Sequence, residues 1–353
     1  MIPDALSLAD LGWSNFFLSQ LDLDDLNTFE PMRVAEVQRS IVRAFAPDGT
    51  HTLTTPPDMP TGDLAIGDWV MVDPASLRII RHLDRRSLLA RKGAGTEARQ
   101  QLIAANIDTL FIVSSCNADF NPARLERYIA LAIEAGAQPV IVLTKADLAD
   151  NAEEYLTKAQ EISPLADAIV LNAKDPLQLD RLVPWCGAGQ TIALVGSSGV
   201  GKSTLINSLA GTSIETRGIR EDDAKGRHTT TTRSLHRMTN GAWLVDTPGM
   251  REIGIQEASE GIEAVFSDII ELATNCRFSD CVHDTEPGCA VQAAIADGSL
   301  DADRLRRWQK LQEEDQRNSE SLAKYRARER ALGRKYRIGK EQVKAKRGDF
   351  LDP

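Results

Sequence analysis

The sequence predicts three folded parts: a small N-terminal β-barrel, a central α/β domain with a parallel sheet, and a C-terminal, mostly helical part that binds a metal. Short β-prone stretches separated by Pro, Gly and Asp occupy the chain from residue 32 to about 92. Apolar strand-like runs then alternate with helical patterns as far as about residue 255. Three cysteines and one histidine cluster in the part that follows. A chain of 353 residues exceeds one ordinary core, so several domains are expected.

Four segments follow from these observations: an N-terminal extension (1–31), the barrel (32–92), the α/β domain (93–260) and the metal-binding part with a basic tail (261–353). The extension mixes Leu, Trp and Phe with many Asp, which is typical of an amphipathic docking segment. In the barrel, Gly67-Asp68-Trp69-Val70 resembles a strand entry common in OB-folds. OB-folds bind single-stranded nucleic acid or structured RNA, and small barrels also bind proteins; we favour RNA here.

A phosphate-binding loop is predicted in the central domain. Residues 191–195 form an apolar, strand-like run, residues 196–203 fit the pattern G-x-x-x-x-G-K-S/T, and the next residues are helical as far as Gly211. Backbone N–H groups at such a helix start bind phosphate oxygens. Lys202 is expected to reach the β- and γ-phosphates, and the Ser203 hydroxyl to bind Mg²⁺. The predicted phosphate-binding residues are Gly196, Ser197, Ser198, Gly199, Val200, Gly201, Lys202, Ser203 and Thr204.

Two further motifs favour guanine as the base. Thr144-Lys145-Ala146-Asp147 follows the strand-like run 139–143 and resembles the N/T-K-x-D motif of GTPases. By that resemblance, Asp147 would accept hydrogen bonds from the guanine N1–H and exocyclic amine, and adenine offers no such pair of donors. Asn172-Ala173-Lys174 follows the run 168–171 and looks like the S-A-K motif, so the Ala173 N–H would face guanine O6. The predicted base-binding residues are Thr144, Lys145, Ala146, Asp147, Asn172 and Ala173.

Asp246-Thr247-Pro248-Gly249 is similar to the D-x-x-G switch of GTPases. Asp246 would hold Mg²⁺ through water, and the Gly249 N–H would contact the γ-phosphate. The next residue is Met250, where Ras-like enzymes carry a Gln that orients the attacking water. A thioether cannot do this, so we expect slow intrinsic hydrolysis.

Another group must then position the water. His228 is the best candidate, because it lies in Gly226-Arg227-His228 directly before four threonines, where a first switch segment belongs. One of these threonines, which we assign as Thr230, would complete the Mg²⁺ ligands with Ser203 and Asp246. The predicted catalytic residues are therefore His228, Lys202 and Thr230.

The order of these motifs is unusual. The base motif comes first, the phosphate loop second and the D-x-x-G motif last, whereas an ordinary small GTPase begins with the phosphate loop. The central part is therefore predicted to be a circularly permuted P-loop GTPase domain that binds GTP or GDP and Mg²⁺.

The cysteines predict one structural zinc ion. Cys276, Cys281, His283 and Cys289 are spaced as ligands of a tetrahedral site, and four protein ligands leave no open position for catalysis. Cys116 and Cys186 have no such neighbours and are expected to be buried thiols. We find no signal peptide and no apolar run long enough for a membrane helix, so a cytoplasmic protein without membrane contact is expected.

Charge is distributed unevenly. The formal net charge is −10, yet residues 324–347 contain eleven Lys or Arg against two Glu, a net of +9 that leaves −19 for the rest. Tyr325 and Tyr336 lie within this basic segment and could stack on exposed bases. A mostly acidic body with one basic arm favours RNA binding through the arm.

The chain resembles the RsgA (YjeQ) family of circularly permuted GTPases. The resemblance rests on the motifs TKAD, GSSGVGKS, GRHTTT and DTPGM in this order, with an OB-like barrel before them and the cysteine cluster after them. The resemblance implies a bacterial GTPase of late small-subunit assembly, whose slow turnover the small ribosomal subunit stimulates and whose partners are this subunit and its rRNA. It also implies a catalytic role for the residue at His228. We expect a monomer with no DNA partner. Thr144 in place of Asn, Asn172 in place of Ser and the acidic extension depart from the family pattern.

Two other classes stay open at this point. A nonenzymatic RNA-binding or scaffold protein, whose nucleotide only holds the fold together, is compatible with Met250. An ATP-dependent enzyme could use the same phosphate loop, although Asp147 argues against adenine. Multiple turnover stimulated by ribosomal subunits would exclude the first class, and failure of ATP to compete with GTP would exclude the second.

Overall fold

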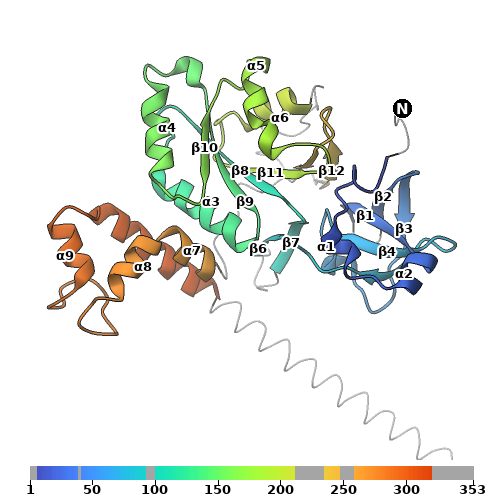
Figure 1. Ribbon diagram of the computed structural model, residues 1–353, viewed down its shortest axis with the longest axis horizontal. Coiled ribbons are helices and arrows are strands. Elements are labelled where there is room, and N and C mark those ends of the chain that lie inside the picture. The colour runs from blue at the N-terminus through green and yellow to red at the C-terminus, as the bar shows by residue number, and fades with distance from the viewer. Residues whose placement is uncertain (1–5, 39–40, 93–99, 211–233, 247–257, 320–353) are drawn as a thin grey trace, which may run out of the picture.

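The computed structural model describes residues 6–38, 41–92, 100–210, 234–246 and 258–319 of the chain. A mixed central sheet lies between an N-terminal antiparallel β-domain and a group of C-terminal helices (Figure 1). The predicted order of barrel, α/β domain and helical part is confirmed.

Five antiparallel strands form the N-terminal domain in the order β3-β2-β1-β4-β5. A parallel bridge between Thr54, directly after β3, and Arg78, at the start of β5, joins the two edge strands. This contact closes the sheet into the five-stranded barrel of an OB-fold. The elements are β1 (Glu30–Val37), β2 (Val42–Ala46), β3 (Gly49–Leu53), the short helix η1 (Thr61–Asp63), β4 (Trp69–Asp73) and β5 (Arg78–His82).

The N-terminal segment (residues 6–28) packs against this barrel and against the central sheet. It contains α1 (Asn15–Leu18) and α2 (Leu23–Thr28), and a capping box begins α2. Leu11 and Phe17 are buried, and the Trp13 ring lies edge-on to the Trp69 ring at 4.7 Å. Part of the apolar face of the amphipathic extension is therefore docked within the same chain, whereas Phe16, Leu18, Leu23 and Leu26 are exposed.

Arg33 of β1 joins the barrel to the central sheet. Its buried guanidinium donates hydrogen bonds to the Leu11 carbonyl at 2.6 Å and to Thr191 Oγ1 at 2.5 Å, and lies 5.9 Å from the Trp243 ring centroid. Burial lowers the pKa of Arg33 to about 10, so the side chain is still charged at neutral pH. The indole N–H of Trp243 donates to the Asp10 carbonyl at 2.7 Å. These contacts fix the barrel against the amino ends of two strands of the central sheet.

The central sheet has the order β10-β9-β8-β11-β13-β12, and in the described chain β12 alone runs antiparallel to its neighbour. Every residue of β8 and β11 is buried, because helices cover both faces of the sheet. A hairpin of β6 (Leu88–Lys92) and β7 (Gln100–Ala105) connects the barrel to it. The strands are β8 (Thr109–Ser115), β9 (Gln138–Thr144), β10 (Asp167–Val170), β11 (Thr191–Val195), β12 (Ser234–Arg237) and β13 (Trp243–Asp246).

Two groups of helices cover the sheet, as Figure 1 shows. Side chains of α3 (Pro122–Glu134) and α4 (Ala152–Gln160) belong to one apolar core, and those of η3 (Asp180–Trp185) and α6 (Lys202–Ala210) belong to another. The short helices η2 (Ala146–Leu148) and α5 (Pro176–Leu179) follow β9 and β10. The helix predicted after the phosphate loop is α6.

The C-terminal helices dock on α3. They are α7 (Ser259–Val265), α8 (Ser267–Ala273), α9 (Ala290–Ala296) and a helix over residues 302–319. The carboxylate of Glu126 on α3 is fully buried and accepts hydrogen bonds from Arg307 at 2.8 and 3.0 Å and from Arg304 at 3.2 Å. Separating a buried carboxylate from its two cationic partners would cost free energy, because the charge would stay buried and unpaired. This interaction therefore holds the C-terminal helices in place.

Close backbone packing between α7 and α3 gives a testable expectation. A Cβ atom added at Gly261 would lie 2.1 Å from the Ala130 carbonyl oxygen, and backbone cannot move aside cheaply. Gly261→Ala is expected to destabilise this interface by about 1–3 kcal/mol, as overpacking does in cores. Thermal unfolding and limited proteolysis would measure the loss. Glu263→Ala, at an exposed position of the same helix, is the control; equal stability of both variants would contradict the expectation.

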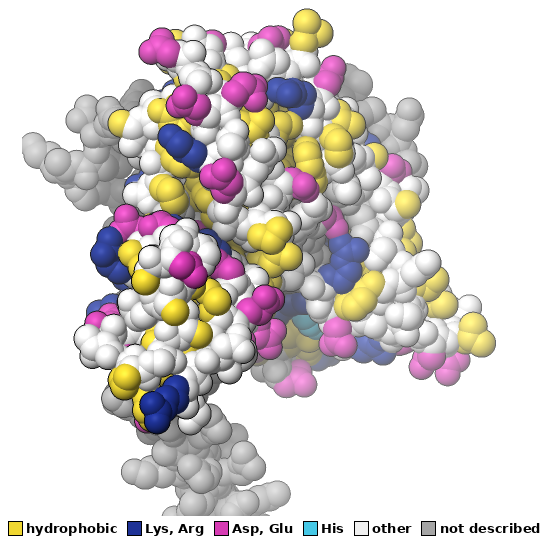
Figure 2. Space-filling model, turned by 60° about the vertical axis from the view of Figure 1, so that its left-hand side comes forward, with side chains coloured by type: hydrophobic (Ala, Val, Ile, Leu, Met, Phe, Trp, Pro, Cys, Tyr) yellow, Lys and Arg dark blue, Asp and Glu magenta, His cyan; other side chains and the backbone are white. Residues whose placement is uncertain are grey.

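The described surface is mixed in charge. On the face drawn in Figure 2, Lys and Arg side chains are scattered among Asp and Glu rather than gathered in one patch. The basic segment 324–347 lies outside the described residues. Among the helices that the structure describes, none has the length and apolarity needed to cross a membrane.

Candidate functional site

Four parallel strands bring the predicted nucleotide motifs to one edge of the sheet. β9 ends at Thr144, β11 ends directly before Gly196, β13 ends at Asp246, and Asn172 lies two residues after the end of β10. Because these strands are parallel, their carboxyl ends lie together, where doubly wound sheets bind ligands.

The phosphate loop needs glycine at three positions. Gly196, Gly199 and Gly201 have φ angles of +141°, +79° and +97°, which other residues rarely adopt. A Cβ atom at Gly196 would lie 2.2 Å from the Val113 carbonyl oxygen, and one at Gly201 would lie 3.1 Å from Thr144 Oγ1. Both the backbone path and the space beside it therefore exclude larger residues at Gly196.

Lys202 and Ser203 begin α6 directly after this loop. The Lys202 ammonium reaches back over the loop and donates to the carbonyls of Gly196, at 2.7 Å, and Ser197. Ser203 and Thr204 are half-buried in the first helical turn, and Ser198 is exposed. The start of α6 thus combines a cation with the N–H end of a helix, an arrangement that suits polyphosphate.

The predicted base motif is tied to the phosphate loop. Thr144 is fully buried, and its hydroxyl is hydrogen-bonded to the carbonyls of Ser114, at 3.1 Å, and Val200 of the phosphate loop. Lys145 has a left-handed backbone with φ +59°, an uncommon conformation for a non-glycine residue. Ala146 and Asp147 follow in η2, and the Asp147 side chain is exposed.

The second base motif lies against α6. Asn172 Oδ1 accepts the Lys174 N–H at 3.0 Å, and the Asn172 N–H donates to Gln178 Oε1 at 2.8 Å. Ser208 of α6 donates its hydroxyl hydrogen to the Ala173 carbonyl at 2.8 Å. This loop is therefore held by its own turn and by the helix that starts at the phosphate loop.

Several predicted residues lie outside the described chain: His228, Thr230, Gly249 and Met250. Three residues are expected to bind Mg²⁺, and two of them lie at the same edge of the sheet. Asp246 ends β13, and Ser203 lies in α6, which follows the neighbouring strand β11.

One residue beside the phosphate loop was not anticipated. Arg124, in the first turn of α3, donates a hydrogen bond to the Ser197 hydroxyl. It belongs to none of the recognised motifs and is 73 residues from its partner in sequence. No local pattern could have identified it.

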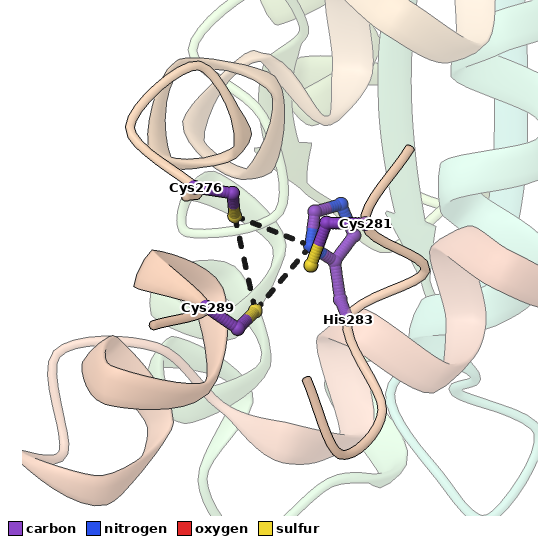
Figure 3. Close-up of side chains that lie close together, drawn as sticks. All are labelled: Cys276, Cys281, His283 and Cys289. Atoms are coloured by element: carbon purple, nitrogen blue, oxygen red, sulfur yellow. Dashed lines mark hydrogen bonds between the residues drawn. The ribbon is translucent and has the colours of Figure 1, made fainter. Parts of the chain in front are cut away.

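The three cysteines and the histidine meet in the C-terminal part (Figure 3). Cys276 follows α8, Cys281 and His283 lie in the loop after it, and Cys289 caps α9. Their ligand atoms all lie within 4.8 Å of one another. His283 Nδ1 is 3.6 Å from Cys276 Sγ and 3.5 Å from Cys289 Sγ, and the two sulfurs are 3.8 Å apart.

Neighbouring groups hold this cluster in shape. The Gln292 side chain donates to the His283 carbonyl at 2.6 Å, and His283 itself has a left-handed backbone with φ +60°. Glu286 accepts the Val282 N–H at 2.9 Å, which closes the loop that carries two of the four residues. The His283 ring lies 5.8 Å from the Trp308 ring, so the last described helix also supports the cluster.

The other two cysteines are isolated, as predicted. Cys116 and Cys186 are both buried, and burial raises the pKa of each thiol to about 11. At neutral pH neither is ionised to a useful degree, which agrees with simple packing roles.

Comparison with known proteins identifies the family to which the chain is similar. The model of the RsgA GTPase family matches residues 82–256. The small ribosomal subunit biogenesis GTPase RsgA of Mesorhizobium japonicum is 53% identical over 317 residues, 89% of this chain and 91% of that protein. The small ribosomal subunit biogenesis GTPase RsgA 2 of Vibrio vulnificus is 46% identical over 332 residues, 94% of each chain.

Solved structures agree on the fold. YjeQ from Thermotoga maritima has a TM-score of 0.58 at 23% identity, over 80% of this chain and 97% of that one. YloQ, described as a circularly permuted GTPase, has a TM-score of 0.57 at 22% identity, over 81% of this chain and 94% of that one. The resemblance noted in the sequence is therefore confirmed, and the chain belongs to the RsgA GTPase family.

Proposed function

We propose that this GTPase acts in the biogenesis of the small ribosomal subunit, binding the subunit and hydrolysing GTP to GDP and phosphate in response to it. The names of the relatives, which are up to 53% identical, support this role. The observation that carries the nucleotide site is the meeting of the phosphate loop, Thr144 and Asp246 at the carboxyl edge of one sheet, in permuted chain order.

In this proposal the phosphate-loop N–H groups and Lys202 hold the phosphates. Asp147 and the Ala173 N–H read the guanine edge, and Lys145 lies over the ring. Ser203, Thr230 and Asp246 hold Mg²⁺, which would neutralise charge on the phosphates during transfer. The exposed Asp147 carboxylate is available to a base arriving from solvent.

His228 is proposed to orient the attacking water, because Met250 cannot donate or accept the required hydrogen bonds. His228 would act on the water when the ribosomal subunit is bound. A water-positioning group supplied only in the complex accounts for slow turnover in its absence.

A structural zinc ion is proposed at Cys276, Cys281, His283 and Cys289. For a tetrahedral ion with ordinary zinc bond lengths, S···S edges should be about 3.8 Å and S···N edges about 3.5 Å. The three measured separations, 3.8, 3.6 and 3.5 Å, fit these values. Four protein ligands would make the ion a folding element of the C-terminal part rather than a catalyst.

Contacts with the rRNA are assigned to the OB-fold barrel and to the basic segment 324–347, whose net charge of +9 would attract phosphates. We also propose a cytoplasmic monomer without a DNA or membrane partner. The division at 1–31, 32–92, 93–260 and 261–353 is kept as the proposed domain organisation.

The decisive test is GTP hydrolysis by the protein alone, with purified small subunits and with large subunits. We expect small subunits, but not large subunits, to increase the rate of GTP hydrolysis by roughly a hundredfold or more. This is the size of effect that one group stabilising the transition state can have. His228→Ala should lose the stimulation while still binding GTP, and His236→Gln, a histidine on β12, should keep it. Equal rates with and without small subunits would contradict the proposal.

A further inference from the structure

The first turn of α3 reaches the phosphate loop from outside the nucleotide motifs. Arg124 is half-buried, and its guanidinium donates to the hydroxyl of Ser197, the second residue of the loop. The Ser197 carbonyl in turn accepts from the Lys202 ammonium. One serine therefore connects a cation on α3 with the lysine that is expected to bind phosphate.

The position of Arg124 is unusual for a cation. Asn121 caps α3 by accepting the Arg124 N–H at 3.1 Å, and Pro122 occupies the first helical turn, so the start of the helix is well defined. A positive side chain in this turn faces the positive end of the helix dipole, which is unfavourable unless an anion lies nearby. The phosphate loop is built to hold such an anion.

The rest of α3 is anchored on its other side. The buried Glu126 carboxylate is bound by Arg304 and Arg307. Arg124 thus extends toward the loop from a helix that the C-terminal part holds in place. A donor on a fixed support can position its acceptor more effectively than one on a mobile loop.

We propose that Arg124 is a positioning residue for the phosphate loop: it holds Ser197, and with it the row of backbone N–H groups that bind the phosphates. The proposal rests on the proposed nucleotide site. GDP and GTP use the same N–H groups, so loss of this contact weakens both to the same extent. KM for GTP should therefore rise while kcat stays the same, because the interaction is equal in the ground and transition states.

The experiment uses the full-length protein and compares Arg124→Met, Ser197→Ala, the double variant and Arg127→Met. Affinities for GDP and for a nonhydrolysable GTP analogue are measured by fluorescence titration, and KM and kcat by phosphate release. Arg124→Met and Ser197→Ala should each weaken both nucleotides by roughly tenfold, the order expected for a hydrogen bond from a charged donor. The double variant should be no weaker than the single ones, because both remove the same contact.

Arg127→Met is the matched control, because this arginine lies one turn along α3 and contacts Glu314 instead of the loop. It should bind nucleotide like the wild type. Arg124→Lys, which keeps one charged donor, should recover part of the affinity. Losses that add up in the double variant, a lower kcat at unchanged KM, or unchanged affinity in Arg124→Met would overturn the proposal.

Lys202→Ala separates this proposal from the nucleotide site on which it rests. If Lys202→Ala loses nucleotide while Arg124→Met binds normally, the site stands and the role of Arg124 is rejected. If Lys202→Ala binds nucleotide like the wild type, the phosphate loop is not the site, and both proposals fall. The melting temperature of each variant is measured as well and should equal that of the wild type, so that a change in affinity is not due to unfolding. If Arg124→Met does not fold, Ser197→Ala removes the same hydrogen bond and tests the same proposal.

Discussion

Asp147→Asn is expected to change the preferred nucleotide from GTP to the xanthine analogue XTP. Guanine offers two donors, N1–H and the exocyclic amine, which a carboxylate accepts, whereas an amide presents one donor and one acceptor. Xanthine carries a carbonyl in place of the amine and matches the amide. Losing about 3 kcal/mol from two charged hydrogen bonds would weaken GTP binding roughly a hundredfold.

Competition titrations with GTP, GDP, XTP and ATP would measure this change. Asp150→Asn is the matched control, since Asp150 is an exposed carboxylate three residues further on. It should keep the preference for GTP. If Asp147→Asn still bound GTP as tightly as the wild type, the base would be read by other residues and the assignment of the TKAD motif would be wrong.

Cys289→Ser is expected to abolish metal binding and to unfold much of the C-terminal part. Structural zinc sites contribute an apparent binding free energy of about 10–16 kcal/mol in small domains, as much as the whole stability of many proteins. Cys289 is also the N-cap of α9, a role that a serine hydroxyl can fill, so a loss of helix in this variant reports the loss of the ion. Zinc analysis, helix content from circular dichroism and proteolysis within residues 258–319 would show the loss.

Cys186→Ser is the control for this substitution. Cys186 is also buried, and its thiol donates to the Leu182 carbonyl at 3.0 Å, a contact that a serine hydroxyl can keep. It should retain one equivalent of zinc and a nearly unchanged fold. Full helix content in Cys289→Ser, or in the wild type after chelation, would show that the C-terminal part folds without a metal.

Elements that depend on adjacent residues were predictable from the sequence. β11, the phosphate loop and α6 occur where residues 191–210 predicted a strand, a loop and a helix. The spacing of Cys276, Cys281, His283 and Cys289 likewise indicated a cluster, and the structure brings their ligand atoms together. In both cases the signal lies within about twenty residues, where backbone geometry limits the possible arrangements.

The docking of the N-terminal segment was not predictable in the same way. Its composition indicated an amphipathic segment, but composition does not say which surface covers its apolar side chains. Trp243 donates to the Asp10 carbonyl across 233 residues, and Arg33 donates to Thr191 across 158. A buried arginine that donates its hydrogen bonds to a carbonyl and a hydroxyl also runs against the usual pattern for charged side chains.

The sequence by itself determined the strands that lead into the nucleotide motifs, the helix after the phosphate loop, the permuted order of the motifs and the composition of the metal cluster. Only the tertiary structure decided that Arg124 meets Ser197, that Thr144 ties the base motif to the phosphate loop, and that Glu126 holds the C-terminal helices on α3. The physical reason is chain separation. A motif works through neighbouring residues, whereas a hydrogen bond between distant ones exists only after the apolar faces of helices and strands have packed and brought their ends together.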